Sequence, residues 1–385
     1  MLPAILVLLP ALLTQGAPAI ASAPALTVTR VLTAHTAAAK LESVGWFGVH
    51  SNGAMALFTP ETHAVQLYGA DGKRGAMVLL ADDGPPIKGP TAGWVGDTLW
   101  VASLAARKIY LLPPHGSEFN SRSSPAVMVL PSDEPVEPEG TLTLPLRVMG
   151  MLGDGSLLVS KMMPAVDTAM PAWRRPARSR IGYAKVTSDG VLREWLAWVP
   201  PVTRCRPAPN IPPLFCNVPW AAVSSDGRFA ASVASSISGS DSGSFRVIAI
   251  DSRGDTTFDR AYGYAATPIP RSVIDSARES TLTDMRKTAP RLADSAERVY
   301  QRSMVTVFPP FAGVLVGRDG TVWIAERPTA VGRTWVELDP HGAIVGRITV
   351  GGTVHLRAVS RSEVWGLDAR DRAPVSIVAY RVAAP

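Results

Sequence analysis

One pattern recurs six times along this chain of 385 residues. In each copy a short apolar stretch leads into a turn, and a second apolar stretch follows that ends in small or aromatic residues. The copies read WFGVHSNGAMALF (46–58), AGWVGDTLWVAS (92–103), RVMGMLGDGSLLVS (147–160), AAVSSDGRFAASV (221–233), AGVLVGRDGTVWIA (312–325) and RAVSRSEVWGL (357–367). Each copy predicts a pair of antiparallel strands, because short apolar runs bounded by turn residues are typical of strands.

The turns within these copies carry a hairpin signature. The pairs are Asn52-Gly53, Asp154-Gly155, Asp226-Gly227 and Asp319-Gly320. Such pairs favour type I′ turns, in which both central residues have positive φ. Trp100, Trp323 and Trp365 fall at about the same place in the second strand, so we expect these side chains in the core.

A second pair of strands follows in each copy except the last. These segments are VQLYGADGKRGAMVL (65–79), IYLLPPHGSEF (109–119), YAKVTSDGVLREW (183–195), RVIAIDSRGDTTF (246–258) and WVELDPHGAIVGRITV (335–350). The sixth, VSIVAYRV (375–382), stops after one strand, and LTVTRVL (26–32) can supply the missing one. Six units of four strands predict an all-β fold, a six-bladed β-propeller whose last blade is closed by the N-terminal strand. This closure leaves no long sheet edge exposed.

The repeats resemble those of a known group, the NHL and TolB-like six-bladed propellers, and above all secreted bacterial proteins of the "6-bladed beta-propeller" type. The resemblance is carried by FPPFAGVLVGRDGTVWIAE (308–326) followed by WVELDPHGAIVGRI (335–348). It implies a propeller over residues 26–385. Motifs of this kind specify blades and leave the activity open.

The N-terminus reads as an export signal. Residues 2–13, LPAILVLLPALL, are as long as the apolar region of a signal peptide and too short to span a bilayer. The small residues Ala19-Ile20-Ala21 and Ala21-Ser22-Ala23 fit a cleavage site, although no Lys or Arg precedes Arg30. We therefore expect a signal peptide over 1–23, a propeller over 24–385, no membrane span after cleavage, and a secreted or periplasmic protein.

The two cysteines agree with export. Cys205 and Cys216 flank a proline-rich loop, CRPAPNIPPLFC. In an oxidising compartment such a pair is typical of a disulfide. The alternative, a metal site, lacks nearby His or further Cys residues.

Three segments interrupt the repeat: an Arg-rich insertion (163–180), the Cys/Pro loop (199–219) and a helical insertion (265–308). In the third, Pro290 suits the first turn of a helix. An apolar stripe follows at helical spacing: Leu292, Ala296, Val299 and Tyr300. We expect this stripe to pack against the propeller as a cap. The blade scheme leaves open which face carries each insertion.

Two groups of residues are candidates for binding. The first is the cluster Trp173, Arg174, Arg175, Arg178 and Arg180, because guanidinium groups bind carboxylate or phosphate bidentately and Trp adds an apolar anchor. The acidic segment 132–140 offers these arginines an internal partner instead. The second group lines the entry of the innermost strands: Trp46, Trp94, Arg147, Trp220, Phe311 and Arg357. The alternative for this group is packing inside the channel.

Composition and motifs narrow the function further. The net charge of +6 comes from arginines spread along the chain, and no nucleic-acid-binding motif accompanies them, so we expect no nucleic acid partner. No nucleophile, zinc or phosphate-loop motif appears, so we assign no catalytic residue, metal ligand or cofactor. We expect a monomeric, secreted, non-catalytic scaffold that binds a protein or an anionic small molecule. The alternative is a metal-dependent, lactonase-like hydrolase or lyase with its site in the central channel, although LESVGWFG (41–48) lacks the E-G-P of lactonases resembling gluconolactonase.

Overall fold

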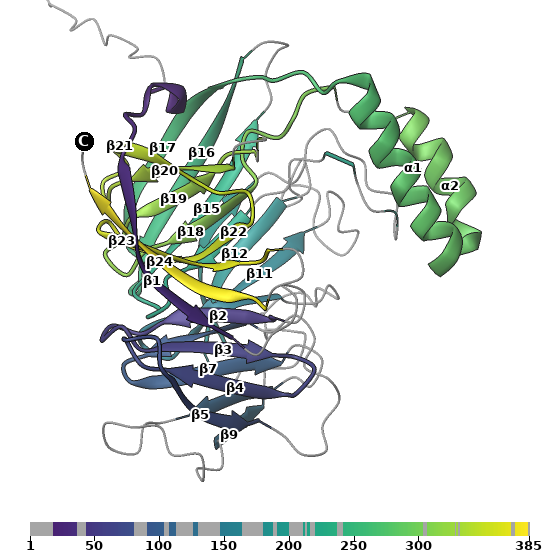
Figure 1. The fold of residues 1–385 in the computed structure, drawn as a ribbon. Coiled ribbons are helices and arrows are strands. Elements are labelled where there is room, and N and C mark those ends of the chain that lie inside the picture. The colour runs from purple at the N-terminus through teal and green to yellow at the C-terminus, as the bar shows by residue number, and fades with distance from the viewer. Residues whose placement is uncertain are drawn as a thin grey trace, which may run out of the picture.

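The computed structural model describes most of the propeller in separate stretches. These are residues 18–36, 44–80, 91–103, 108–112, 126–129, 147–163, 180–187, 191–199, 211, 214–215, 220–236, 242–302, 306–327, 329, 332–370 and 374–383. Within them the strands form six antiparallel sheets of four strands each. The fold is the predicted six-bladed β-propeller (Figure 1).

Each blade runs outward from an inner strand. Blade 1 contains β2 (Trp46–Val49), β3 (Met55–Thr59), β4 (Ala64–Tyr68) and β5 (Arg74–Leu79), and blade 2 contains β6 (Thr91–Val95), β7 (Thr98–Ser103), β8 (Lys108–Leu112) and β9 (Ala126–Val129). Blade 3 contains β10 (Arg147–Met151), β11 (Leu157–Met163), β12 (Arg180–Val186) and β13 (Leu192–Val199), and blade 4 contains β14 (Trp220–Val223), β15 (Phe229–Ser236), β16 (Ser242–Asp251) and β17 (Thr256–Ala265). Blade 5 contains β18 (Gly313–Val316), β19 (Val322–Ala325), β20 (Arg333–Leu338) and β21 (Ile344–Val350).

Blade 6 is built from both ends of the chain. It contains β22 (Val354–Val359), β23 (Glu363–Asp368) and β24 (Ser376–Ala383), and its outer strand is β1 (Thr27–His35). β1 pairs antiparallel with β24 from Thr27 opposite Ala383 to His35 opposite Ser376. The predicted closure of the last blade by the N-terminal strand is confirmed.

Apolar side chains between adjacent blades hold the ring together. The tryptophans predicted for the core are buried: Trp100 is 2%, Trp323 0% and Trp365 9% exposed. The inner strands of successive blades contact each other around the whole ring, β22 and β2 included. Successive side chains of a strand point to opposite sides of the sheet. Each blade therefore buries apolar side chains against both of its neighbours.

Antiparallel order gives the propeller two different faces. In every blade the first and third strands run one way and the second and fourth run the other. The loops between second and third strands and the connections between blades therefore share one end, which we call the insertion face. The opposite end, with the short turns between first and second and between third and fourth strands, we call the turn face. The strands that bound all three insertions end at the insertion face, which settles what the sequence left open.

The tight turns differ from the type I′ prediction. The glycines of the four pairs have positive φ, but the preceding Asn or Asp does not. In the turn of blade 3, Gly155 N donates to Leu152 O at 2.9 Å, and the Asp154 carboxylate accepts from Ser156 N at 3.0 Å. This is a type I turn followed by one left-handed glycine. The aspartate side chain stabilises it by bonding to the backbone two residues on.

The third insertion is helical, as predicted. It consists of α1 (Arg271–Thr288) and α2 (Pro290–Arg302), which stand out from the blades (Figure 1). The apolar stripe on α2 is buried, with Ala296 at 0% and Tyr300 at 6% exposure. It packs against Leu282 and Met285 of α1 and against Ile211, and among the described residues no blade residue belongs to this cluster. The expectation that the stripe covers the propeller is therefore wrong, because the two helices bury their apolar sides against each other.

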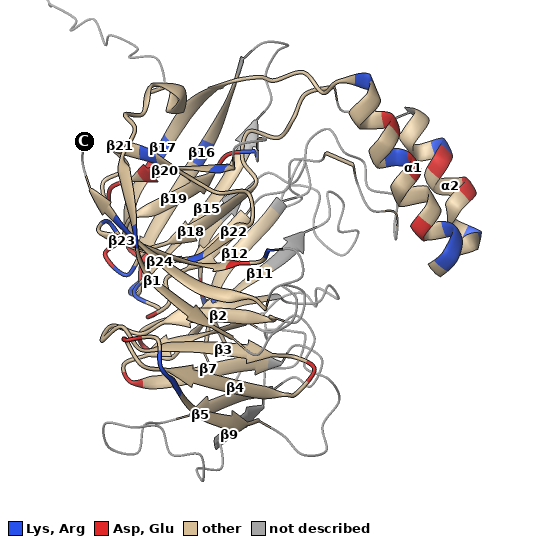
Figure 2. Ribbon diagram, in the orientation of Figure 1, with Lys and Arg blue, Asp and Glu red and all other residues tan. Residues whose placement is uncertain are grey.

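Charges of both signs cover the outside of this helical pair (Figure 2). Arg271 and Asp275 lie 3.2 Å apart, and Arg286 lies 3.2 Å from Glu279. Such exposed pairs contribute only about 0.3–0.5 kcal/mol each. They keep the outer surface of the helices polar.

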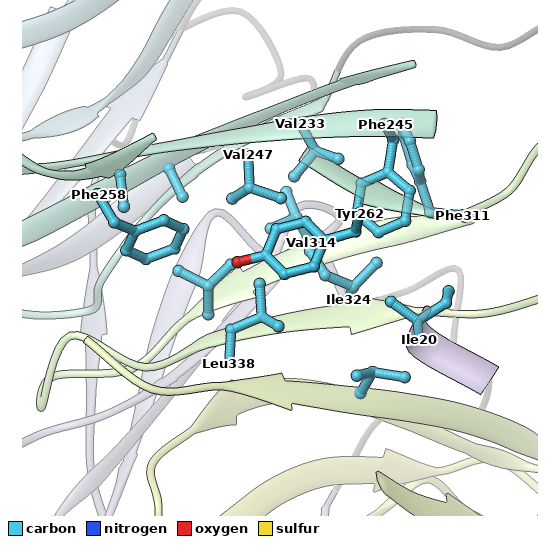
Figure 3. Close-up of a cluster of buried hydrophobic side chains, with 14 of the residues drawn as sticks. Ile20, Val233, Phe245, Val247, Phe258, Tyr262, Phe311, Val314, Ile324 and Leu338 are labelled. Atoms are coloured by element: carbon cyan, nitrogen blue, oxygen red, sulfur yellow. The ribbon is translucent and has the colours of Figure 1, made fainter. Parts of the chain in front are cut away.

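The segment before β1 is packed into the fold. Pro18 O accepts a hydrogen bond from Gly263 N at 3.0 Å, and Pro24 O accepts one from Arg347 N at 2.8 Å. Ile20, in a short 3-10 turn (Ile20–Ser22), is 4% exposed and joins the apolar cluster between blades 4 and 5 (Figure 3). The predicted cleavage positions lie inside this packed segment. No helix among the described residues is long and apolar enough to cross a bilayer.

Candidate functional site

The central channel is crossed at the turn face. Ser225, in the turn between β14 and β15, accepts a hydrogen bond from Trp94 N at 2.5 Å and donates its hydroxyl to Val49 O at 3.2 Å. Next to it, Gly227 O accepts from Gly153 N at 2.9 Å. This turn of blade 4 thus joins blades 1, 2 and 3, and it narrows the channel at the turn face.

Arg357 is the candidate residue that the structure places in the channel wall. It lies in the middle of β22, where the register with β23 shifts between Leu356 and Ala358. A bulge of this kind redirects a side chain out of the regular alternation. Arg357 is exposed to solvent. β22 is the innermost strand of blade 6 and borders the channel, so we assign the exposed Arg357 side chain to the channel wall.

A second arginine lies close to the first. Arg333, at the insertion-face end of β20, is on the same side of the strand as Trp335, which packs against β22. Burial lowers the pKa of Arg357, and the positive charge of Arg333 lowers it further. Burial also lowers the pKa of Arg333. The two cations therefore stand in a poorly solvated wall between blades 5 and 6.

No acid in the described part of the chain neutralises this pair. The carboxylates that form ion pairs with arginine there belong to Asp251, Asp255, Asp259, Asp275, Glu279, Glu297 and Asp368, and their partners are other arginines. A buried or crowded cation is costly unless it is paired. Arg333 and Arg357 thus form a cation pair, named so from here on, that an anion would stabilise.

Two further candidates lie at the insertion-face mouth of the channel. Trp220 is the first residue of β14 and is 44% exposed, an unusual position for a large aromatic side chain. Arg147 is the first residue of β10, and its side chain lies outside the description. Strand 1 of every blade starts at the insertion face, so Trp220 and the backbone of Arg147 belong to one rim.

Three of the predicted channel residues have structural roles instead. Trp94 is 1% exposed and packs against His50, with ring centroids 4.7 Å apart. Phe311 is 2% exposed and lies edge-on to Phe245 at 5.6 Å. Trp46 is half-buried and packs against the cluster between blades 1 and 2. Trp46 and Trp94 lie on inner strands, whose alternation turns side chains towards the neighbouring blades. Phe311 precedes β18 and packs into the apolar cluster between blades 4 and 5.

The Arg-rich cluster is outside the described residues. This applies to Trp173, Arg174, Arg175 and Arg178, to the acidic segment 132–140, and to Cys205 and Cys216. Arg180 is described only as the first backbone position of β12, at the insertion face. Its role, and the disulfide, stay predictions.

The described residues contain no group of three or more His, Cys, Asp or Glu side chains that could hold a metal ion. That part of the chain thus gives the lactonase-like alternative no cluster of these four residue types. The sequence pattern does not single out Arg333, because the apolar run of its strand begins only at Trp335. A single arginine before a strand carries no signal, because its partner in blade 6 is distant in sequence.

Comparisons with known proteins support the fold and go no further. No family model matches the sequence, and the search of curated proteins finds no match. A DUF4221 family member from Bacteroides vulgatus is 9% identical with a TM-score of 0.51, covering 94% of this chain and 99% of that one. Virginiamycin B lyase from Staphylococcus aureus, in an inactive variant, is 12% identical with a TM-score of 0.36, covering 94% and 100%.

The aldose sugar dehydrogenase from Streptomyces coelicolor is likewise 12% identical, with a TM-score of 0.38 and coverage of 94% and 100%. The lyase and the dehydrogenase superpose too loosely to support an argument about this chain. At such identities a likeness shows the fold alone. The chain is a six-bladed β-propeller, and its predicted place in the NHL and TolB-like group stays a prediction.

Proposed function

We propose that this protein is an exported, non-catalytic propeller that binds a small anionic molecule through Arg357 and Arg333. The observation that carries the proposal is the cation pair: two partly desolvated guanidinium groups, close enough to repel, without a carboxylate partner among the described residues. A carboxylate or phosphate group would supply the missing counter-charge. Export rests on the leader-like sequence at the N-terminus.

The chemistry of the pair favours a ligand with two acidic groups. Each guanidinium presents a planar fork that binds a carboxylate or phosphate bidentately. Hydrogen bonds to charged groups contribute about 1.5–3 kcal/mol each. Two such contacts, less the cost of association, are compatible with micromolar to millimolar affinity.

The rim residues extend this surface. Trp220 offers an exposed aromatic face at the insertion-face mouth of the channel. Arg147 and Arg180 start strands at the same face, and the segment with Trp173, Arg174, Arg175 and Arg178 connects strands that end there. We include these residues in the proposed binding surface.

A thermal-shift screen tests the proposal. Phosphate, citrate and succinate at 10 mM are compared with chloride at equal ionic strength. A ligand at 100 times its Kd raises stability by about 2.7 kcal/mol. We expect citrate to raise the Tm of the wild type and to lose this effect in Arg357→Gln. The absence of any shift with all three anions would contradict the proposal.

The same screen covers the alternative. Calcium, zinc and manganese chlorides at 1 mM are tested without added polyanions. A metal-dependent, lactonase-like hydrolase or lyase would be stabilised by one of them at this concentration. Such a shift, combined with none for the anions, would favour the enzyme over the binding scaffold.

A further inference from the structure

A cavity lies at the root of the helical pair. It has a volume of about 390 Å³. Neither Arg333 nor Arg357 lines it, so it is separate from the cation pair. Its walls come from three parts of the chain: the N-terminal 3-10 turn, the end of β17 with both tethers of α1 and α2, and the loop after β19. The cavity therefore lies where blades 4 and 5 meet the insertion.

The walls are held in place by hydrogen bonds. The two tethers pair with each other, since Ile269 N donates to Thr306 O at 2.8 Å and Phe308 N donates to Thr267 O at 2.9 Å. On the opposite wall Ile20 is buried, and the bond between Pro18 O and Gly263 N fixes the turn that contains it. A cavity with such walls is formed before a ligand enters, which reduces the cost of binding.

The lining is mostly apolar and aromatic. Tyr264, Phe308 and Pro310 contribute rings, and Ile20 contributes an aliphatic side chain. The guanidinium of Arg327 lies over the Phe308 ring, 3.1 Å from its centroid. This stacking occupies Arg327 with the ring and leaves it no ion pair with the neighbouring carboxylate among the described residues.

That carboxylate belongs to Glu326, and its negative charge determines which charge the ligand should carry. The side chain is half-buried and lines the cavity. In the described part of the chain it has no side-chain hydrogen bond and no ion pair. Burial raises its pKa, and the charge of Arg347 only partly opposes this effect. A half-buried acid at a cavity wall gains most from a cation that brings its own hydrogen-bond donors.

We propose that this cavity binds an organic ammonium ion with an aromatic or aliphatic body. The ammonium group donates to the Glu326 carboxylate, and the body packs against Phe308, Tyr264 and Pro310. A single carboxylate does not provide the several oxygen ligands that a divalent metal ion requires. A volume of about 390 Å³ lies within the range of small-molecule sites. The site therefore selects a cationic ligand, whereas the cation pair selects an anionic one.

Calorimetric titration with three probes tests this assignment on the uncleaved chain, because cleavage after Ala23 would remove Ile20 and Ala21 from the cavity wall. Phenethylammonium carries both the charge and the body, 2-phenylethanol keeps the body without the charge, and ethylammonium keeps the charge with little body. We expect phenethylammonium to bind at least tenfold more tightly than either of the others. Equal affinity for 2-phenylethanol would contradict a role for the carboxylate.

Variants locate the binding. Glu326→Gln removes the charge and should weaken phenethylammonium binding at least tenfold. Glu61→Gln is the matched control, because Glu61 is exposed in the β3–β4 loop on the same face, and it should leave the affinity unchanged. Ala21→Phe fills the cavity from an exposed position in the N-terminal turn and should abolish binding without disturbing the core. Unchanged affinity in both Glu326→Gln and Ala21→Phe would overturn the proposal.

Discussion

Arg30 Nη2 lies 2.8 Å from Asp368 Oδ2, although the two residues are 338 positions apart in the chain. Arg30 belongs to β1 and reaches over the Tyr380 ring of β24 to β23, which carries Asp368. Asp368 also accepts from the Thr353 hydroxyl at 2.7 Å and pairs with Arg370 at 3.0 Å. One buried carboxylate thus joins the N-terminal strand to the C-terminal blade and closes the ring.

Asp368→Asn should destabilise the protein by about 1–3 kcal/mol, because it removes the charge that two arginines share at a buried position. The matched control is Asp259→Asn in blade 4, whose partner Arg246 is exposed, and which should cost less than about 1 kcal/mol. Urea denaturation at pH 7 measures both. Equal losses in the two variants would contradict the closing role of Asp368.

The same variant has a predictable pH dependence. Burial raises the pKa of Asp368, but hydrogen bonds from Arg30, Thr353 and Arg370 outweigh it and hold the pKa below its usual value. A lowered pKa contributes stability at neutral pH that is lost as the pH falls through it. The difference between wild type and Asp368→Asn should therefore shrink towards acid pH, which the same urea denaturation repeated in acid measures. A difference that does not change with pH would contradict the role of the charge.

Glu337 makes the opposite prediction. It is 1% exposed, its Oε1 has no hydrogen-bond partner among the described residues, and burial raises its pKa to about 7. The charges of Asp319 and Asp339 raise this pKa and that of Arg361 lowers it. Since the native state holds this proton more tightly than the unfolded chain, stability should fall as the pH rises from about 4.5 to 7.

Glu337→Gln should therefore be more stable than the wild type at pH 8, by up to about 3 kcal/mol, and similar to it at pH 4. Denaturation midpoints at the two pH values measure this difference. Glu279→Gln, at an exposed position on α1, serves as the control and should show no such change. A gain for Glu337→Gln that is the same at both pH values would contradict the burial of a protonated acid.

Two glycines with the same conformation should respond differently to alanine. Gly155 has φ of +82° with open space around it, whereas a Cβ on Gly227, φ +71°, would meet Met151 O at 2.5 Å. The left-handed conformation costs alanine about 1–2 kcal/mol at either position. Urea denaturation should show a clearly larger loss for Gly227→Ala, since its turn presses against blade 3. An equal loss of stability in the two variants would show that the backbone contact between blades 3 and 4 can shift at little cost in free energy.

The N-terminal segment gives a prediction about processing. A chain that begins at Pro24 lacks Ile20 and the bond from Gly263 N to Pro18 O. Losing one buried isoleucine and one hydrogen bond should lower stability by about 2–4 kcal/mol relative to a chain that begins at Pro18. Thermal denaturation compares the two chains. Equal stability would show that the segment is dispensable and would support cleavage after Ala23.

The blades could be predicted from the sequence because each repeats the same local code. Asp154, Asp226 and Asp319 precede left-handed glycines, and the short apolar runs on either side of them form strands. The turn type could not be predicted, because a type I′ turn and a type I turn followed by one left-handed glycine both favour an Asp-Gly pair. The prediction that Ala296 and Tyr300 pack against the propeller is wrong. An apolar stripe on a helix shows that another element covers it, but does not identify that element.

The candidate site was predictable only in part. Arg357 was identified by its place in an inner strand, but its neighbour Arg333 comes from another blade. Trp94 and Phe311 have the same local pattern as a channel residue, and only the packing of adjacent blades shows that they are buried. Contacts between blades depend on the closed ring, which no single repeat contains.

Calorimetric titration of citrate into the wild type, Arg357→Gln and Arg333→Gln, at low salt and pH 7, tests the central claim most directly. Arg228→Gln is the matched control, because Arg228 is an exposed arginine in a turn of blade 4 on the turn face. We predict that the wild type and Arg228→Gln bind citrate with the same Kd, and that each cation-pair variant binds at least tenfold more weakly. Citrate binding that is unchanged in Arg357→Gln, or absent from the wild type, would contradict an anion site in the channel.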